Sequence, residues 1–498
     1  MENTKKTFRE LLDKIQAYGH AMSKMYYDSV TVMPKRGNEA VGRTLGVLSE
    51  EEYKLSTSEE LKSCTKELLA HKDELDAITA REAELTWESF SKLEKIPMDE
   101  YVQYQMDVNT AQGVWHEAKV KSDFAMFAPH LEKLVKFNRN MARYIDPEKP
   151  PYDVLLDEYE KGMTMEKLDE FFAKVRAGVV PLLKAVMERG RKIDVSFLEK
   201  DFAIDKQREF SEFLMKLMRM DKERSAIGET EHPFTINFTK NDVRITTHYH
   251  EDMLLSSLYS VVHEAGHATY ELNIGDELAM TTLGTGVSMG VHESQSRFYE
   301  NIIGRSREFV GLIYGELVRL FPQEMEGVTE EQLYLAVNRA QPSLIRTEAD
   351  ELTYALHVMV RYEIEKKLIA GEIEVAELPK LWNELYKEYL GVDVPDDKNG
   401  VLQDSHWSGG SFGYFPSYAI GSAYAAQLLS VMEEEMDVFA QVKSGDLQPI
   451  IDWLTCRIYK FGCLKKPGEL IEQACGKPFD PQYYIDYLTK KFTEVYKL

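Results

Sequence analysis

Apolar residues recur three and four positions apart over much of the chain, with charged residues between them. Three stretches show this most clearly: FRELLDKIQAYGHAM (8–22), LKSCTKELLAHKDELDAITAREAELTWESFSKL (61–93) and MEKLDEFFAKVRAGVVPLLKAVMERG (165–190). Such spacing places the apolar side chains on one face of a helix. We therefore predict packed long helices from residue 5 to about 230. The Pro- and Asp-containing break YIDPEKPPYD is short, which indicates a loop between helices and no interdomain linker.

The pattern changes at HPFTINFTKNDVRITTHYH (232–250), where β-branched and aromatic residues alternate around a polar TKND turn. This alternation predicts a β-hairpin. A helical pattern resumes in DMLLSSLYSVVHEAGHATYELN, for which Asp252 is the expected N-cap. Further amphipathic helices follow to the end, interrupted by a Gly-rich stretch after residue 400.

No repeat and no boundary between independently folding parts stands out. We predict one mainly α unit over 1–498, with a helical half (1–231), a part that carries the chemical motifs (232–420) and C-terminal helices (421–498).

The charge balance limits the partners of the protein. The 84 acidic residues outnumber the 60 basic ones, for a formal net charge of -24. Such a field repels phosphate backbones and anionic lipid surfaces, so we expect neither a nucleic acid nor a membrane as partner.

The chain lacks an apolar run of bilayer length, and its first residues lack the apolar region of a signal peptide, so we expect a cytoplasmic protein. The four cysteines form no CxxC pair. We interpret them as reduced thiols, which argues against a cysteine-bound zinc and against a catalytic thiol.

The stretch HEAGH combines two imidazoles with a carboxylate. His263 and His267 lie four apart, so a helix presents both on one face, where they can bind one metal ion. Glu264 flanks that site, where zinc hydrolases need a general base. The alternative is that both are ordinary helix histidines. Six of the twelve histidines lie between 232 and 292, and this clustering favours a site.

A catalytic zinc usually has three protein ligands and one open position. Glu293, in GVHESQS and 26 residues beyond His267, is the candidate for the third ligand. The alternative for Glu293 is a surface ion pair with Arg297, one turn further along the helix.

Six short stretches together resemble the Taq-type thermostable metallocarboxypeptidases, a family distantly similar to angiotensin-converting enzyme and to neurolysin-like oligopeptidases. The stretches are HPF (232–234), DVRIT (242–246), HEAGH (263–267), HESQ (292–295), IRTEAD (345–350) and GVLQDSHW (400–407). The resemblance implies a large helical zincin fold with a deep groove between two helical halves and a small hairpin or sheet beside the HEAGH helix.

The resemblance also implies roles for single residues. His263, His267 and Glu293 are similar to the metal ligands of the family, and Glu264 to its general base. Arg346 resembles the clamp for the terminal carboxylate of the substrate, a role that suits a bidentate and permanently charged guanidinium. Without the resemblance, an ion pair with Asp350 would be the preferred interpretation of Arg346.

Other positions are similar to groups that contact the substrate. His406 and a tyrosine, Tyr418 more than Tyr414, resemble groups that hydrogen-bond the substrate and the oxyanion. The resemblance further implies substrate contacts for three residues: His232, Arg244 and Gln403. In the family, HPF and DVRIT are thought to close one end of the groove. The alternative for Arg244 is a simple pair with Asp242.

We therefore expect a metal-dependent carboxypeptidase that removes single residues from peptides with a free C-terminus. Zinc is the expected ion, and Co²⁺ or Mn²⁺ also suits two histidines and a glutamate. A homodimer is implied by the resemblance alone. Two alternatives are an endo-oligopeptidase of the same helical zinc class and a non-catalytic peptide-binding protein with a structural metal.

Overall fold

Helices dominate the chain because the apolar stripes in its sequence are long. In the computed structural model, which describes residues 1–498, α8 (Met165–Arg189) shows this most simply. Thr164 caps the helix by accepting a hydrogen bond from the backbone of Lys167. The residues that α8 buries recur at three- and four-residue intervals: Leu168, Phe171, Phe172, Val175, Val179, Leu183 and Val186. This helix agrees with the predicted stretch to within one residue.

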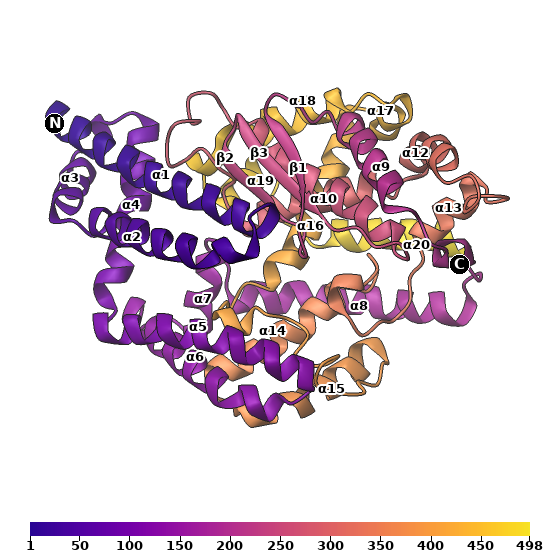
Figure 1. Cartoon of the computed structure of the whole chain (residues 1–498), viewed down its shortest axis with the longest axis horizontal. Coiled ribbons are helices and arrows are strands. Elements are labelled where there is room, and N and C mark those ends of the chain that lie inside the picture. Colours follow the sequence, from indigo (N-terminus) through magenta and orange to yellow (C-terminus); the bar gives the residue numbers. More distant parts are fainter.

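The first seven helices form one side of the molecule (Figure 1). They are α1 (Glu2–Thr31), α2 (Asn38–Ser56), α3 (Glu59–Ala70), α4 (Ala77–Lys95), α5 (Met98–Lys121), α6 (Phe124–Ile145) and α7 (Pro151–Tyr159). The predicted stretch 61–93 is interrupted between α3 and α4. Asp76 starts α4 there, because its side chain accepts a hydrogen bond from the backbone of Thr79.

A three-stranded sheet lies beside the central helices. Its strands are β1 (Ser225–Glu229), β2 (Thr235–Thr239) and β3 (Asp242–Thr247), in the order β1-β3-β2. The predicted hairpin is β2 with β3, which pair antiparallel with Thr235 opposite Ile245. β1 was not predicted. β1 follows α9 (Ile204–Leu217) in the chain and pairs parallel with β3, with Ser225 opposite Val243.

The helix after the sheet, α10 (Leu254–Leu272), carries HEAGH and is buried along most of its length. The prediction of Asp252 as its N-cap was wrong, because the N-cap residue is Met253 and no side chain caps the helix. Asp252 lies instead in a turn closed by a hydrogen bond from the backbone N–H of Met253 to the carbonyl of His250.

The remaining helices follow α10 in the chain. They are α11 (Met289–Arg297), the π-helical segment η4 (Phe298–Ile303), α12 (Arg307–Leu320), α13 (Glu330–Val337), α14 (Tyr354–Ala370), α15 (Leu378–Leu390), α16 (Pro416–Glu435), α17 (Val438–Ser444), α18 (Gln448–Arg457), α19 (Pro467–Cys475) and α20 (Gln482–Tyr496). In Figure 1, α20 runs alongside α8, and the two chain ends lie on opposite sides of the molecule.

One large hydrophobic core connects residues from Ala111 to Tyr496. A second, small core of Phe8, Leu11, Leu12, Leu61, Leu68 and Ala83 holds the N-terminal helices together. The prediction of a mainly helical fold with a small sheet beside the HEAGH helix is confirmed. The division into segments at 231 and 420 stays a prediction.

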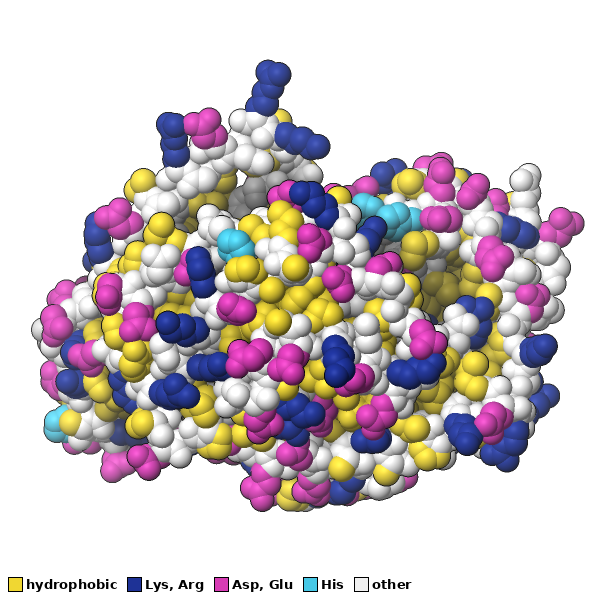
Figure 2. Space-filling model, turned by 90° about the horizontal axis from the view of Figure 1, so that it is seen from below, with side chains coloured by type: hydrophobic (Ala, Val, Ile, Leu, Met, Phe, Trp, Pro, Cys, Tyr) yellow, Lys and Arg dark blue, Asp and Glu magenta, His cyan; other side chains and the backbone are white.

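The surface carries both signs of charge. Seen from below, Lys and Arg side chains lie among Asp and Glu side chains, so this face carries no single acidic patch (Figure 2). None of the helices combines the length and the apolar character needed to cross a bilayer.

Candidate metal centre and substrate groove

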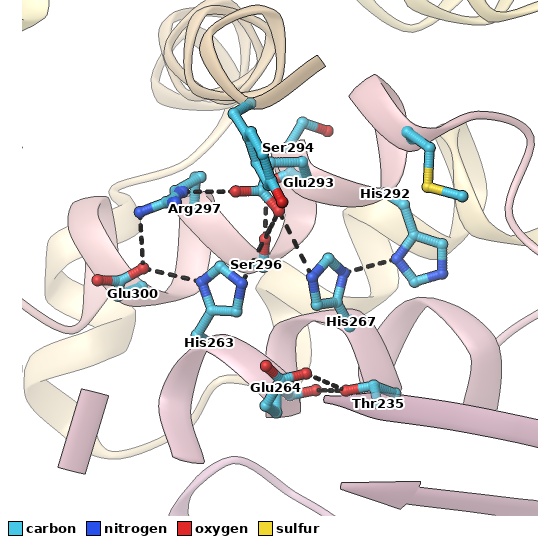
Figure 3. A network of polar contacts seen from close by, with 12 residues as sticks. Thr235, His263, Glu264, His267, His292, Glu293, Ser294, Ser296, Arg297 and Glu300 are labelled. Atoms are coloured by element: carbon cyan, nitrogen blue, oxygen red, sulfur yellow. Dashed lines mark hydrogen bonds and ion pairs between the residues drawn. The ribbon is translucent and has the colours of Figure 1, made fainter. Parts of the chain in front are cut away.

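α10 presents the two histidines of HEAGH on one face, as the spacing predicted. His263 and His267 project from neighbouring turns toward Glu293 on α11 (Figure 3). Glu264 points to the flank of this group, away from the two imidazoles and toward β2.

Two glycines fix the position of α11. A Cβ on Gly266 of α10 would lie 2.7 Å from the carbonyl oxygen of Gln295, and a Cβ on Gly421 of α16 would lie 2.7 Å from Cβ of Glu293. Any side chain at either position would push the helices apart. The backbone of α11 therefore packs directly against both α10 and α16, and this close packing restricts the position of Glu293.

Three donor atoms meet at the centre of this arrangement. Oε2 of Glu293 lies 3.8 Å from Nε2 of His263 and 3.6 Å from Nε2 of His267. The three donor atoms all lie within 4.8 Å of one another. Two ligands of a tetrahedral zinc, at bond lengths of roughly 2.0–2.1 Å, lie about 3.4 Å apart. These residues therefore fit a divalent metal ion with only small adjustments.

Local electrostatics keep His267 and Glu293 in states that can bind a metal. Burial alone would lower the pKa of His263, but the carboxylates of Glu293 and Glu300 outweigh it and raise that pKa above its ordinary value. Burial lowers the pKa of His267 to about 3, so this imidazole is neutral at physiological pH. Burial alone would raise the pKa of Glu293, but Arg297 and His263 outweigh it and hold that pKa well below its usual range. Nε of Arg297 donates to Oε1 of Glu293 over 2.7 Å. The ion pair with Arg297, considered from the sequence as the alternative to a ligand role, thus exists, but it is mostly buried and leaves Oε2 facing the histidines.

Glu300 orients His263 from behind. Its Oε2 lies 2.8 Å from Nδ1 of His263, which leaves Nε2 of that ring for a metal. Two arginines hold the Glu300 carboxylate in place: Arg297 and Arg305. Glu300 belongs to η4, a π-helical segment of the kind often found at functional sites. Sequence reasoning missed Glu300, although it lies seven residues beyond Glu293 and therefore on the same helix face.

Glu264 has the surroundings of a base. Its Oε2 accepts a hydrogen bond of 2.6 Å from Oγ1 of Thr235 on β2. Burial raises the pKa of Glu264 above its ordinary value, which brings it closer to the operating pH that proton transfer favours. Glu264 lines the same cavity as His263, His267 and Glu293, with a carboxylate that suits proton transfer.

These groups open into a cavity of about 780 Å³ between the N-terminal helices and the catalytic helices. Five residues from α4 and the α7 end form the N-terminal wall: Arg81, Leu85, Glu158, Tyr159 and Lys161. The hairpin contributes Pro233, Phe234 and Thr235. The ring of Phe234 packs near Tyr26 and Tyr27 of α1, with centroids 5.9 and 6.4 Å away. HPF therefore borders the groove, and α1 backs it from outside.

Tyr414 and Tyr418 both line the cavity, and His406 supports one of them. Nε2 of His406 lies 3.1 Å from the hydroxyl of Tyr418. Burial lowers the pKa of His406 to about 4, so this ring is neutral. The buried carboxylate of Glu365 anchors the loop between them by accepting hydrogen bonds from the side chain of Trp407 and the backbone of Gly413.

Arg346 lies behind Tyr418 and does not line this cavity. Nε and Nη2 donate to Oδ1 of Asp404 over 3.0 and 2.9 Å, and Nη1 donates to the Tyr354 hydroxyl over 2.9 Å. No pair with Asp350 forms, since both oxygens of that carboxylate accept other hydrogen bonds.

Gln403 and Arg361 belong to the same buried network. Oε1 of Gln403 accepts hydrogen bonds from the backbone N–H of Arg346 and from Nη2 of Arg361. Arg361 is completely buried and also binds Asp404. Gln403 therefore holds the backbone of Arg346 in place and does not line the cavity.

Arg244 and His232 also lie outside the cavity wall. Arg244 donates from Nε and Nη2 to both oxygens of Asp242, over 2.8 and 3.0 Å, so the simple pair considered from the sequence is formed. Lys24 of α1 binds the same carboxylate. This cluster fastens α1 to the hairpin. His232 is exposed at the start of the hairpin.

A buried carboxylate joins the groove wall to α11. Glu160 follows Tyr159 at the end of α7, and its Oε2 accepts a hydrogen bond of 3.1 Å from the backbone N–H of Gly290 in the first turn of α11. Oε1 accepts one of 3.1 Å from the Tyr424 hydroxyl on α16. Burial raises the pKa of Glu160 to about 7.

We expect Glu160→Gln to reduce the pH dependence of stability. The folded-state pKa of about 7 exceeds the ordinary 4.5, so the folded protein retains a proton that the unfolded chain releases. The resulting stabilisation is fully present below about pH 4.5 and is lost as the pH rises through about 7, by up to about 1.4 kcal/mol per pH unit. Between pH 5 and 8 the wild type should lose about 2 kcal/mol more unfolding free energy than the variant, as measured by denaturant titration.

The control for this experiment is Glu158→Gln. Glu158 is two residues away but partly exposed and paired with Lys92. Its variant should follow the wild-type pH profile, and an equal change in both variants would contradict the role of burial at Glu160.

A groove between helical halves, with two histidines and an adjacent glutamate on one helix and a second glutamate on the next, defines a helical metallopeptidase. Comparison with known proteins makes this specific. The chain belongs to the carboxypeptidase Taq (M32) metallopeptidase family, whose model matches residues 7–492.

Relatives from several organisms cover nearly the whole chain. It is 41% identical to carboxypeptidase 1 of Bacillus subtilis over 494 residues, 99% of both chains. It is 35% identical to thermostable carboxypeptidase 1 of Thermus thermophilus over 94% of both chains. The crystal structure of the M32 carboxypeptidase from Deinococcus radiodurans R1 matches with a TM-score of 0.94 and 35% identity, over 100% of this chain and 99% of that one. The predicted family and function are confirmed: this protein is a metallocarboxypeptidase.

Proposed function

We propose that the chain releases C-terminal residues one at a time, with His263, His267 and Glu293 as metal ligands and Glu264 as general base. The observation that supports this most directly is the meeting of three donor atoms within 4.8 Å beside a buried carboxylate that is not one of them. A structural site would employ a fourth protein ligand, whereas three ligands leave a position for the reacting groups.

Zinc is the proposed ion. Two imidazole nitrogens and one carboxylate oxygen form a donor set of intermediate softness that suits zinc and also accepts Co²⁺ or Mn²⁺. Elemental analysis of protein purified without added metal, followed by competition among the three ions, identifies the one that is bound.

Bound by His263, His267 and Glu293, a divalent ion would supply Lewis-acid polarisation of the scissile carbonyl and would acidify the attacking water. Glu264 accepts the proton of that water and delivers it to the leaving amine, while Thr235 holds one oxygen of its carboxylate in place. Tyr418 and Tyr414 line the cavity, and their hydroxyls are the proposed donors to the oxyanion that develops. His406 orients Tyr418 through the 3.1 Å contact.

Arg346 is the proposed partner of the substrate's terminal carboxylate. Its three side-chain hydrogen bonds leave two of the five guanidinium N–H groups for a ligand, and the guanidinium lies 4.8 Å from the ring of Tyr418, which lines the groove. A shift of the Tyr418 ring on substrate binding would open this path. His232, Arg244 and Gln403 keep their proposed substrate roles through the resemblance, with Gln403 acting through Arg346.

We expect Arg346→Gln to lower kcat/KM about 10- to 100-fold for a peptide with a free C-terminus, the cost of one or two charge-assisted hydrogen bonds. Activity on the C-terminally amidated twin should change little, so the preference for the free acid falls. Steady-state kinetics on both peptides measure this. Arg361→Gln is the matched control, because it disturbs Asp404 equally without reaching the substrate. Equal losses in the two variants would show that Arg346 acts only within the buried network.

Mass spectrometry of product peptides tests the proposed function. An unblocked peptide and its amidated twin are incubated with metal-loaded enzyme and with a chelated control. A ladder of single C-terminal losses from the free-acid peptide, abolished by chelation, is the expected result. Internal cleavage of both peptides would assign the enzyme to the endo-oligopeptidases.

A homodimer and a cytoplasmic location complete the proposal. The four free cysteines support a reducing compartment. Sedimentation equilibrium of the metal-loaded enzyme tests the dimer, and fractionation of the source cells tests the location.

A further inference from the structure

A buried carboxylate without an assigned role lies one turn beyond His267 on the same helix. Glu271 is 1% exposed. Four donors surround it: Nε2 of His292 at 2.8 Å, Oγ1 of Thr285 at 2.9 Å, the backbone N–H of Gly286 at 2.9 Å and Nδ2 of Asn237 at 2.8 Å. Surrounded in this way, the Glu271 carboxylate acts only as an acceptor.

The acceptor at Glu271 determines the hydrogen positions on two imidazoles in turn. Nε2 of His292 must donate to it, so in the neutral ring Nδ1 of His292 carries no hydrogen and accepts. That Nδ1 lies 2.6 Å from Nδ1 of His267, which therefore donates. Nε2 of His267 is then left with a lone pair, and it is this atom that faces Glu293 (Figure 3).

His292 is held rigidly enough for this role. Its ring lies 5.2 Å from that of Tyr270, and a Cβ on Gly286 would lie 2.5 Å from its Cδ2, so the loop closes tightly over the ring. His292 also belongs to α11, next to Glu293. The contact with His267 thus connects the two helices that carry the proposed ligands.

The two ligand histidines are oriented differently. His263 contacts the carboxylate of Glu300 directly. Nδ1 of His267 reaches the carboxylate of Glu271 only through the imidazole of His292. Partners of this kind fix the tautomer and the direction of a ligand histidine, and their loss commonly weakens metal binding by about 10- to 100-fold.

We propose that His292 is a positioning residue for the metal and that Glu271 acts by fixing the tautomer of His292. His292 then holds His267 with Nε2 directed at the ion and so raises the affinity of the site. This inference rests on the proposed function, because it takes His267 as a ligand.

Three variants of the full-length enzyme separate the two hydrogen bonds of His292, the one to Glu271 and the one to His267. His292→Asn keeps an acceptor oxygen near the position of Nδ1, so it preserves the bond to His267 and loses only Glu271. His292→Gln places its amide near Nε2 and reaches Glu271 but not His267. His292→Phe retains the ring shape with no acceptor. His248→Gln is the matched control, a half-buried histidine whose Nδ1 contacts only the carbonyl of Thr230.

The dissociation constant of Zn²⁺ is measured by competition with a chromogenic chelator. We expect His248→Gln and His292→Asn to stay within about 3-fold of the wild type, and His292→Gln and His292→Phe to bind about 10- to 100-fold more weakly. The visible spectrum of the Co²⁺-loaded proteins should change in the last two only. Equal Zn²⁺ affinity in all variants would overturn the proposal. Equal losses of Zn²⁺ affinity in His292→Asn and His292→Gln would overturn it too. If the Phe variant does not fold, the Asn and Gln comparison decides alone.

His267→Ala tests the ligand role of His267 separately from the positioning role of His292. If it binds Zn²⁺ as tightly as the wild type, the ligand assignment itself is wrong. If it loses Zn²⁺ while the His292 variants do not, only the positioning role is wrong.

Discussion

Glu264→Gln is expected to lower kcat by a factor on the order of 10²–10⁴ with no loss of bound metal. The amide has nearly the shape of the carboxylate and still accepts the hydrogen bond from Thr235, but it cannot take a proton from the attacking water. Metal content by elemental analysis, and kcat by a ninhydrin or mass assay, are the two measurements. KM should stay close to the wild-type value, because Glu264 contributes to the transition state more than to ground-state binding.

The control for this variant is a carboxylate from the opposite wall of the cavity. Glu158→Gln removes the same charge from the groove, so any general electrostatic effect should appear there too. A fully active Glu264→Gln enzyme would remove the base assignment. Loss of metal from Glu264→Gln would instead place Glu264 among the ligands.

Glu293→Gln should have the second large effect, a loss of the metal itself. An amide cannot supply the anionic oxygen, and the buried Arg297 is left without the partner that its Nε contacts at 2.7 Å. We expect the metal dissociation constant to rise more than about 100-fold, beyond the usual cost of losing an outer partner. Activity should fall in parallel and recover partly in excess Zn²⁺, which Glu264→Gln activity should not.

Glu300→Gln provides the graded comparison for Glu293→Gln. Glu300 contacts His263 and Arg297 but not the three donor atoms, so its variant should show the smaller, 10- to 100-fold loss in affinity. If both variants lose metal equally, Glu293 does not act as a direct ligand.

The features that could be predicted are those with a local signal. The apolar stripe of α8 and the alternation in the hairpin each lie within one short stretch of sequence. The spacing of His263 and His267 likewise determines a common helix face wherever the helix packs. β1 has no such signal, because the strand SAIGE has only five residues and is half-buried. Its partner β3 is also not its neighbour in the sequence, since β2 lies between them.

The partners of charged residues were the least predictable features. Arg346 has Asp350 four residues away, but it binds Asp404, 58 residues further along the chain. Whether a buried charge takes a local or a distant partner depends on how the helices pack. Glu271 had an available signal, since 263, 267 and 271 form one stripe on α10. Its meaning required His292 on another helix.

Gly266 and Gly421, where α10 and α16 cross α11, make the metal site comparable to a rigid chelator, in which the backbone sets the distances between the donor atoms. The separation of the donor atoms follows from how closely three helices approach, and a single methyl group at Gly266 or Gly421 would widen it. Selectivity between Zn²⁺ and larger ions such as Mn²⁺ can therefore change through substitutions that touch neither ion nor peptide. For engineering a carboxypeptidase with a different metal, these helix crossings offer a more gradual adjustment than the ligands themselves.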